Sequence, residues 1–224
     1  MSGTGGARPF VTLSWAQALD GSIAAAPGTR TAISGPESMA MTHRLRAAHD
    51  AILVGVGTVL ADEPSLTVRF AEGSHPRPVV LDARLRTPPS ARLFGPGDRR
   101  PIIVGSAGAD RGAGGALEAA GARVLLIEPG PDGRPPLPAV LEALYEEGVR
   151  RLMVEGGASV LAAFLAEDLA DELVVTVAPR ILAGLNPFHP APAGIDAARL
   201  ACSLAGVGWE RHGDDMVFRG RPRR

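Results

Sequence analysis

A carboxylate and two adjacent glycines lie between an apolar run and a helical pattern late in the chain. Glu155-Gly156-Gly157 follow the predicted strand 151–154, whose last three residues are apolar, and a helical pattern begins near Ala158. Such a turn leaves free N–H groups at a helix N-terminus, where an anion such as a diphosphate can bind. Glu155 would end a buried strand, where a carboxylate is costly unless something uses it, and ligands bind at such strand ends in open α/β sheets. By spacing alone, an ordinary β–α turn explains the glycines equally well.

A second Gly-rich segment, Gly55 to Pro64, also follows an apolar run. It is not a Gly-x-Gly-x-x-Gly dinucleotide fingerprint, because Leu60 occupies the position of the third glycine. Thr58 and Asp62 are four residues apart, so a helical turn through them would point both side chains to the same side. A hydroxyl and a carboxylate placed in this way suit a nucleotide sugar or an amide. The alternative is that Asp62 is a cap or turn residue before the proline.

A third group of candidate residues is basic. Arg44 and Arg46 lie on a predicted helix, and Arg69 follows the run Leu66-Thr67-Val68. Converging guanidinium groups suit a phosphate, because each can donate two parallel hydrogen bonds to it. Taken singly, each of these arginines fits a solvated surface position at least as well.

The composition narrows the classes of protein that fit. The chain has 224 residues, 46% of them apolar, and a formal net charge of −1, which gives no electrostatic reason to expect nucleic acid or a membrane as partner. Cys202 is the single cysteine and the five histidines show no metal-ligand spacing, so we expect no disulfide and no metal site. The N-terminal residues contain no apolar signal core, and the longest apolar run, 51–61, is too short for a bilayer. We therefore expect a cytoplasmic protein with a small-molecule ligand.

The alternation of apolar runs and helical patterns predicts the elements that position these residues. Strands are expected over residues 10–15, 51–56, 78–81, 101–104, 123–127, 151–154 and 172–178. Helices are expected over residues 36–49, 137–147 and 158–167 and in a segment that ends before Gly121, with a terminal hairpin over 206–219. Ser34 and Glu37 would form a capping box at the start of the first helix.

This order of elements predicts an α/β fold. Helices would cover a mixed, mostly parallel sheet, and a C-terminal antiparallel hairpin would extend one edge. No change of composition divides the chain. We therefore expect residues 9–219 to form a single domain, and residues 1–8 and 220–224 to be flexible tails.

Five segments, taken together, resemble a known family. They are VTLSWAQALDGSIA (11–24), ISGPESMAMTHRLRAAHDAILVGVGTVLADEPSLTVR (33–69), PVVLDARLRTP (78–88), LMVEGGASVLAAFL (152–165) and ELVVTVAPRIL (172–182). From about Pro9 to about Phe218, the chain resembles the pyrimidine reductases of riboflavin biosynthesis. The resemblance implies a three-layer dihydrofolate-reductase-like fold, NADPH as cofactor and a homodimer. Because strand 172–178 and the following run 179–182 are apolar, we expect the homodimer to use this region or the terminal hairpin. It also implies reduction of the ribosyl group of a 5-phosphoribosylamino-pyrimidine to a ribityl group, with hydride transfer to the sugar C1′.

The same resemblance implies roles for individual residues. Cofactor positions fall on Ala16, Thr58 and Asp62 and on the turn formed by Gly156, Gly157, Ala158, Ser159, Val160 and Leu161. Substrate positions fall on Arg46, Leu66, Arg69 and Glu155. Glu155 is also the candidate catalytic residue, as a polar group near the reacting end of the substrate.

Three departures from the deaminase-fused members bear on the substrate. Ser14 and Ala18 stand where those members typically carry Lys and Ser, and Ala32 stands where they often have Trp. A serine hydroxyl can donate or accept a hydrogen bond, whereas a lysine only donates. We therefore expect the diamino-pyrimidinone as the preferred substrate, with the deaminated amino-uracil as the alternative.

Two other functions stay open at this point. A pteridine or folate reductase of the same fold would need a buried carboxylate on the first helix, and Glu37 is the one clear acidic candidate there. A non-catalytic nucleotide-binding relative would keep the fold without the chemistry. The presence of both Thr58/Asp62 and Glu155-Gly156-Gly157 favours an enzyme.

Overall fold

The computed structural model describes residues 6–26, 28–29, 31–95 and 99–224. Within them, the strands are β1 (Phe10–Ala18), β2 (Ala51–Gly55), β3 (Arg77–Leu81), β4 (Ile102–Ser106), β5 (Arg123–Ile127), β6 (Arg151–Gly156), β7 (Glu172–Ala178), β8 (Ser203–His212) and β9 (Asp215–Arg223). The helices are α1 (Pro36–Ala47), α2 (Val56–Asp62), α3 (Arg111–Ala119), α4 (Leu137–Glu146) and α5 (Ala158–Ala166), with short 3-10 helices at η1 (Arg92–Phe94) and η2 (Ala197–Leu200).

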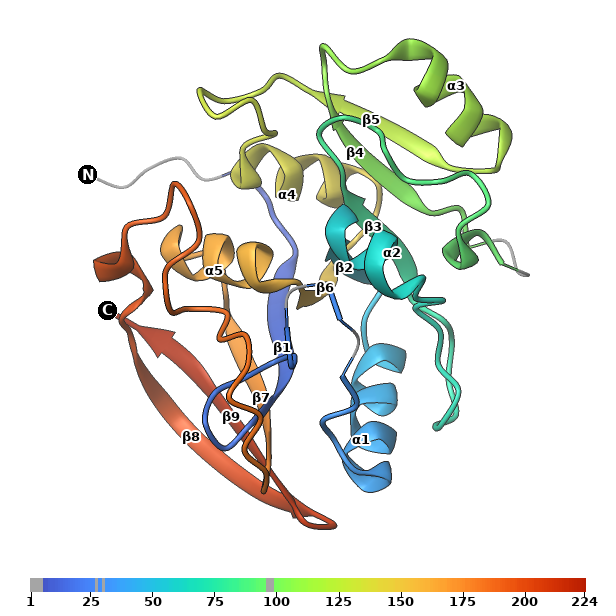
Figure 1. Ribbon diagram of the computed structural model, residues 1–224. Coiled ribbons are helices and arrows are strands. Elements are labelled where there is room, and N and C mark those ends of the chain that lie inside the picture. Colours follow the sequence, from blue (N-terminus) through green and yellow to red (C-terminus); the bar gives the residue numbers. More distant parts are fainter. Residues whose placement is uncertain (1–5, 27, 30, 96–98) are drawn as a thin grey trace.

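The strands form one sheet in the order β5-β4-β3-β2-β6-β1-β7-β9-β8. All pairs from β5 to β7 are parallel, and the hairpin β8–β9 joins β7 in antiparallel orientation. The predicted mixed sheet with a terminal hairpin is therefore confirmed. Figure 1 shows the hairpin extending from one side of the molecule, with β4 and β5 on the opposite side. β6 lies between β2 and β1, although it comes about a hundred residues later in the chain than β2.

Alternation along the central strands divides the core into two layers, because successive side chains of a strand point to opposite faces. Leu53 and Leu152 face one side and pack with Leu141 of α4 and Phe164 of α5. On the other side, Ile52 packs in a cluster with residues of α2 and α3, including Val59 and Leu117. Met153 faces that same side and packs against Met41 and Leu45 of α1. The helices thus cover both faces of the sheet, as the three-layer expectation requires.

Some predicted boundaries differ from the structure. β1 continues to Ala18, three residues beyond the expected end. The residue before α1 is Gly35, which has no side-chain cap, so the capping box predicted for Ser34 and Glu37 is wrong. Glu37 instead lies beside Gly213 in the hairpin turn. A Cβ added at Gly213 would be only 2.6 Å from a carboxylate oxygen of Glu37.

Both predicted tails also need correction. Residues 220–223 continue β9, and 221–223 pair with β8, because the hairpin is longer than its apolar pattern suggested. At the other end, Arg8 forms a two-bond ion pair with Asp171 at 2.7 and 2.8 Å, so it is anchored. Residues 1–5 of the predicted N-terminal tail lie outside the described residues.

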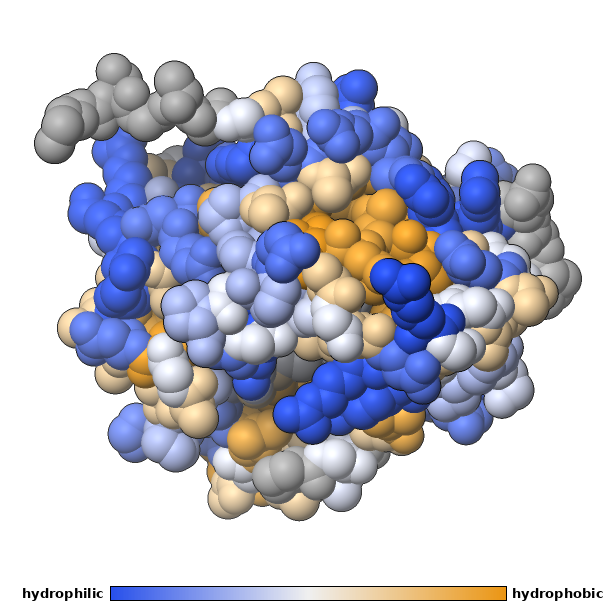
Figure 2. Space-filling view, turned by 90° about the horizontal axis from the view of Figure 1, so that it is seen from above, coloured by the Kyte–Doolittle hydropathy of each residue, from blue (hydrophilic) through white to orange (hydrophobic). Residues whose placement is uncertain are grey.

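The surface has the character expected of this composition. Seen from above, most of it is hydrophilic, and apolar side chains form a larger area near the middle of the view and smaller areas below it (Figure 2). Among the described residues, no helix combines the length and the apolar character that crossing a bilayer requires.

Candidate functional site

A cleft of about 1040 Å³ opens at the carboxyl ends of the parallel strands. Its walls come from β1 and α1, from residues that end or follow β2, β3 and β6, and from the segment between β5 and α4. Ligands of open α/β sheets bind at this edge, because the loops there converge from several strands. Predicted site residues that line the cleft are Ala16, Thr58, Asp62, Glu155, Gly157, Ala158, Ser159, Val160 and Leu161.

The Gly156-Gly157 turn connects β6 to α5 and requires both glycines. Their φ angles are +91° and +83°, in the left-handed region that other residues avoid. A Cβ on Gly156 would lie 2.7 Å from Cγ of Leu161, and one on Gly157 would lie 3.1 Å from Oγ1 of Thr58. The turn therefore leaves the start of α5 open to close approach, and its first turn carries no acidic residue that would repel an anion.

Thr58 and Asp62 both face the cleft from α2, as the four-residue spacing predicted. Thr58 donates a hydrogen bond to the carbonyl oxygen of Gly156 over 3.4 Å, which connects α2 to the Gly-Gly turn. One carboxylate oxygen of Asp62, Oδ1, is buried and has no hydrogen-bond partner among the described residues. Because an orphaned buried acceptor is costly, a ligand donor at this position would satisfy it.

Glu155, the second-last residue of β6, forms an ion pair with Arg46 of α1. Nε and Nη2 of Arg46 donate to the two carboxylate oxygens over 2.6 and 2.7 Å. The third donor, Nη1, reaches the carbonyl oxygen of Thr67 over 3.0 Å. Burial alone would lower the pKa of Arg46, but the charge and hydrogen bonds of Glu155 outweigh burial and raise it. The pair is therefore a fixed, charged connection between a helix, a loop and a strand end.

The arginines that were predicted to bind a phosphate have different partners in this structure. Arg46 is occupied by Glu155, whereas Arg69 is exposed and donates to Oγ of Ser65 over 3.0 Å. Arg44 is also exposed. Leu66, carried over as a substrate position, packs its side chain into the core and is 3% exposed. The spacing of residues in the sequence could not predict the ion pair between Arg46 and Glu155, because the two residues are 109 positions apart.

A buried histidine fixes the backbone at Arg69. Nδ1 of His43, on α1, accepts a hydrogen bond from the backbone N–H of Arg69 over 2.8 Å. The ring of Phe70 packs edge-on against the imidazole. Burial, helped by the positive charges of Arg46 and Arg69, lowers the pKa of His43 to about 4. The imidazole is therefore neutral near pH 7, as its acceptor role requires.

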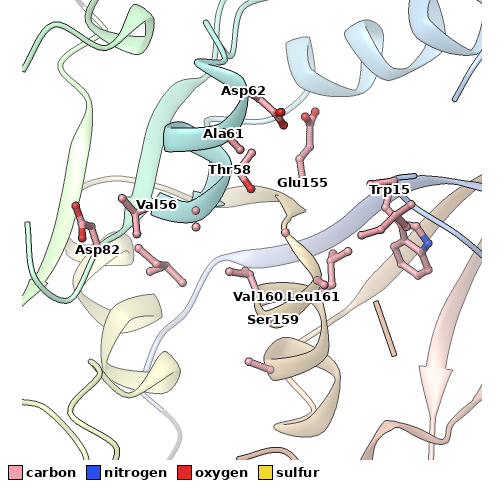
Figure 3. Close-up of a pocket in the computed structure, with 18 of the residues that line it drawn as sticks. Trp15, Val56, Thr58, Ala61, Asp62, Asp82, Glu155, Ser159, Val160 and Leu161 are labelled. Atoms are coloured by element: carbon pink, nitrogen blue, oxygen red, sulfur yellow. The ribbon is translucent and has the colours of Figure 1, made fainter. Parts of the chain in front are cut away.

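Several cleft residues were missed in the sequence. Asp82 directly follows β3, is fully buried, and accepts from the backbone N–H and the hydroxyl of Thr87 over 2.6 and 2.8 Å. Trp15, Arg86 and Arg134 also line the cleft. Asp82 carries the same signal as Glu155, a carboxylate at the end of an apolar run, and this signal could have found it. In Figure 3, Asp82 and Trp15 lie on opposite sides of Thr58, Asp62 and Glu155, and the last two point into the same region.

Other candidate chemistries find no support in the geometry. Glu37, which a folate-type site would use, does not line the cleft. In the part of the chain that the structure describes, no group of His, Cys, Asp or Glu side chains could hold a metal ion.

Comparison with known proteins decides the family. Residues 9–218 match the family model described as the RibD C-terminal domain. The chain belongs to the RibD C-terminal domain family. Relatives named 2,5-diamino-6-ribosylamino-4(3H)-pyrimidinone 5′-phosphate reductase are 40% identical in Methanothermobacter thermautotrophicus and 37% identical in Archaeoglobus fulgidus. Each match covers 79% of this chain, and 81% and 83% of those proteins.

Solved structures agree with this RibD C-terminal domain assignment. Acinetobacter baumannii RibD is similar with a TM-score of 0.78 and 27% identity, over 99% of this chain and 59% of that one. The Rib7 reductase of Saccharomyces cerevisiae gives a TM-score of 0.77 and 28% identity, over 96% of this chain and 90% of that one. A dihydrofolate reductase from Enterococcus faecalis, with a TM-score of 0.52 and 14% identity, shares the fold. The chain spans about half of the RibD protein of Aquifex aeolicus, 48% of its length.

Proposed function

We propose that this RibD C-terminal domain family member is an NADPH-dependent reductase of riboflavin biosynthesis. Its substrate would be 2,5-diamino-6-(5-phosphoribosylamino)pyrimidin-4(3H)-one, and its product the corresponding ribityl compound. The observation that carries the proposal is the identity of 35–40% with archaeal and fungal proteins named for this reductase activity. The cleft supplies an independent argument, because its residues fit a dinucleotide.

The fit to NADPH rests on two features of the cleft. The Gly156-Gly157 turn and the open start of α5 suit the diphosphate, since glycines allow close approach and the helix N-terminus favours an anion. The unpartnered Oδ1 of Asp62 suits a hydroxyl or amide donor, and the Thr58 hydroxyl lies on the same face of α2. In this proposal, residues 158–161 complete the turn that binds the diphosphate. Ala16 contributes to the cofactor site from β1, where it lines the cleft.

Bound NADPH would supply the hydride that reduces C1′ of the ring-opened ribosylamine. Solvent or a protein group would supply the one proton that the reduction also needs. The protein would orient the two reactants and exclude water. Glu155 is our candidate for the polar group at the reacting end. Because both of its oxygens accept hydrogen bonds from Arg46, it would act as a fixed acceptor of substrate hydroxyl or amino groups rather than as a free base.

Substrate binding would use the neighbouring basic groups. Arg69 has an exposed guanidinium held by one hydrogen bond to Ser65, which leaves donors for the 5′-phosphate. Arg46 would contribute its charge from within its ion pair. Leu66 would contribute through its backbone, since its side chain is in the core.

The preference between the two pyrimidines is tested by kcat/KM for each compound with excess NADPH. The two rings differ at one exocyclic group, and Ser14, which lines the cleft, can donate or accept. A kcat/KM that is at least about tenfold higher for the diamino-pyrimidinone supports the proposal. A tenfold preference for the amino-uracil, which corresponds to about 1.4 kcal/mol, would reject the diamino-pyrimidinone as substrate. NADPH binding without turnover of either compound would favour a non-catalytic nucleotide-binding relative.

We also propose a homodimer that uses the hairpin β8–β9. β7, considered from its apolar sequence as an alternative interface, lies inside the sheet between β1 and β9, and this explains its composition. β8 is an edge strand whose Val207 and Trp209 are 52% and 67% exposed, so a second copy would cover them. Light scattering at micromolar concentration tests this. A dimer that becomes monomeric in Trp209→Ser is the expected result, and a monomeric parent protein would contradict it.

A further inference from the structure

Two loops remain paired beyond the carboxyl ends of β1 and β7. The two strands pair up to their last residues, and residues 19–24 and 180–185 follow them. The N–H of Ile23 donates to the carbonyl oxygen of Leu185, and the N–H of Leu185 donates to that of Ala24, each over 2.8 Å. The two loops therefore form one unit, which we call the clasp.

The side chains of Asp20 and Ser22, in the first loop of the clasp, hold the second loop by its backbone. Oδ2 of Asp20 accepts from the N–H groups of Leu182 and Ala183 over 3.2 and 2.6 Å. Oγ of Ser22 accepts from the next N–H group, that of Gly184, over 2.9 Å. Together with the Leu185 N–H, four consecutive backbone donors thus bind to the first loop.

The second loop follows a backbone path that few residues allow. Ala183 has a φ angle of +48°, in the left-handed region, which costs energy unless the surrounding contacts impose it. A Cβ on Gly184 would lie 2.1 Å from the carbonyl oxygen of Ala24, so no side chain fits there. Asp20 is exposed, and water could replace many of its hydrogen bonds, so they add little to the stability of the fold. Their main effect is to select this one conformation of the loop.

The clasp presents an apolar wall to the cleft. Ile23, Ala24 and Leu185 line the cleft, and so do Trp15 and Ala16 of the preceding strand β1. The side chains of Ile23 and Leu185 are half-buried, so a ligand in the cleft can cover the rest of them. The wall is thus a continuation of β1, and its position depends on the hydrogen bonds of the clasp.

This wall lies beside the end of the cleft where the reaction would take place. β1 and β6 are parallel neighbours, and their register pairs Leu13 with Val154. The next residues, Ser14 and Glu155, both line the cleft. In the proposed function Glu155 is at the reacting end, so the wall that continues β1 borders the same end. Apolar side chains there would exclude water and restrict the orientation of the two reactants, as hydride transfer requires.

We propose that Asp20, assisted by Ser22, is a positioning residue for hydride transfer, because it fixes the clasp and thereby the apolar wall at the reacting end. Asp20 is not among the residues that line the cleft, so it acts through the backbone of the second loop. This inference rests on the proposed function, and it adds residues that have no contact with cofactor or substrate in that function.

The test is the single-turnover rate of NADPH oxidation with saturating diamino-pyrimidinone. Asp20→Ala should lower this rate about tenfold or more, as a small misplacement of reacting groups does, while the Kd for NADPH changes by less than about threefold. Ser22→Ala removes one of the four hydrogen bonds and should lower the rate less. Asp196→Asn is the matched control, because Asp196 is also exposed and accepts from a backbone N–H, that of Ala198, but does not line the cleft.

Hydrogen exchange distinguishes a displaced loop from a destabilised fold. The amides of residues 182–184 should exchange faster in Asp20→Ala, and the amides of the central strands should exchange as in the parent. Asp20→Asn keeps one acceptor oxygen, so it should show both the lower rate and the faster exchange to a smaller extent. It carries the same test if Asp20→Ala does not fold.

The outcomes separate the inference from the proposed function. A single-turnover rate within about threefold of the parent in the folded Asp20 variants, or a loss that saturating NADPH restores, overturns the inference. Turnover of NADPH with the pyrimidine by the parent leaves the proposed function standing in that case. A parent that oxidises NADPH with neither pyrimidine contradicts the proposed function, and the inference falls with it.

Discussion

The guanidinium of Arg46 and the carboxylate of Glu155 meet through two hydrogen bonds of 2.6 and 2.7 Å, with side chains only 14% and 17% exposed. Arg46 also holds the carbonyl oxygen of Thr67. One side chain thus fixes α1, the loop after α2 and the end of β6 relative to one another. The geometry of the cleft near Glu155 depends on this pair.

A double-mutant cycle on this pair should reveal strong coupling. Arg46→Met alone leaves a largely buried carboxylate without its partner, and we expect the free energy of unfolding to fall by about 3 kcal/mol. Glu155→Gln should cost a similar amount, and the double variant should cost clearly less than the sum. Urea unfolding measures all three. Arg211→Gln, which removes an exposed ion pair with Asp214, is the control and should change stability by no more than about 0.5 kcal/mol. Additive single effects would show that the pair is not coupled.

Asp62→Ala should separate binding from stability. If Oδ1 accepts a hydrogen bond from NADPH, its loss should weaken cofactor binding by about 1–3 kcal/mol. Because that oxygen has no partner among the described residues, the variant should unfold at the same temperature as the parent or a higher one. Calorimetric titration and thermal unfolding measure the two effects. Glu118→Ala, the control, removes an exposed carboxylate on α3 and should change neither NADPH affinity nor the unfolding temperature. If Asp62→Ala binds NADPH as tightly as the parent, Asp62 is not part of the cofactor site.

Replacing glycine by alanine should have opposite effects at two positions. Gly156→Ala places a side chain at a φ of +91° and 2.7 Å from Leu161, so we expect a loss of stability of about 2 kcal/mol or more. Its NADPH affinity should also fall, because the start of α5 must shift. Gly115→Ala lies inside α3 with open space around the new Cβ, and it should stabilise the protein by about 0.4–1 kcal/mol. A neutral result at Gly156 would mean that the turn adapts without strain.

The buried His43 predicts a loss of stability in mild acid. Its pKa is lowered to about 4 in the folded protein, from an unfolded value near 6.5, so the unfolded chain binds the proton first as the pH falls. Stability from this group is therefore complete above pH 6.5 and declines as the pH falls toward 4, by at most about 1.4 kcal/mol per pH unit. Protonation also removes the acceptor for the N–H of Arg69.

Unfolding measured between pH 4 and 7.5 checks this prediction. His43→Asn keeps a polar acceptor without a titrating group, and its stability should depend less on pH than that of the parent. His189→Gln changes an exposed histidine and serves as the control. Parallel pH profiles for the parent and His43→Asn would contradict the role of His43. His49, whose pKa is also lowered chiefly by burial, should contribute in the same direction. The free energy of unfolding of both proteins should therefore still decrease somewhat as the pH falls.

The sequence predicted the local parts of the site better than its long-range contacts. The position of Glu155 at a strand end and the shared face of Thr58 and Asp62 follow from local patterns, and the structure has both. The pairing of Arg46 with Glu155 depends on where β6 enters the sheet, and no local pattern contains that information. Likewise, the apolar β7 resembled an interface in sequence because a buried interior strand and a covered edge have the same composition.

The place of β6 also has a consequence for how the protein is made. β1 and β2 leave the ribosome early. In the folded sheet β6 lies between them, so each lacks this neighbour until residues 151–156 emerge. Until then, two apolar strand edges stay open to pairing with other chains. Because β6 also carries Glu155 and leads into the Gly-Gly turn, a nascent chain acquires its ligand site only as its aggregation-prone edges close. Chains interrupted before residue 151 should therefore be both inactive and insoluble.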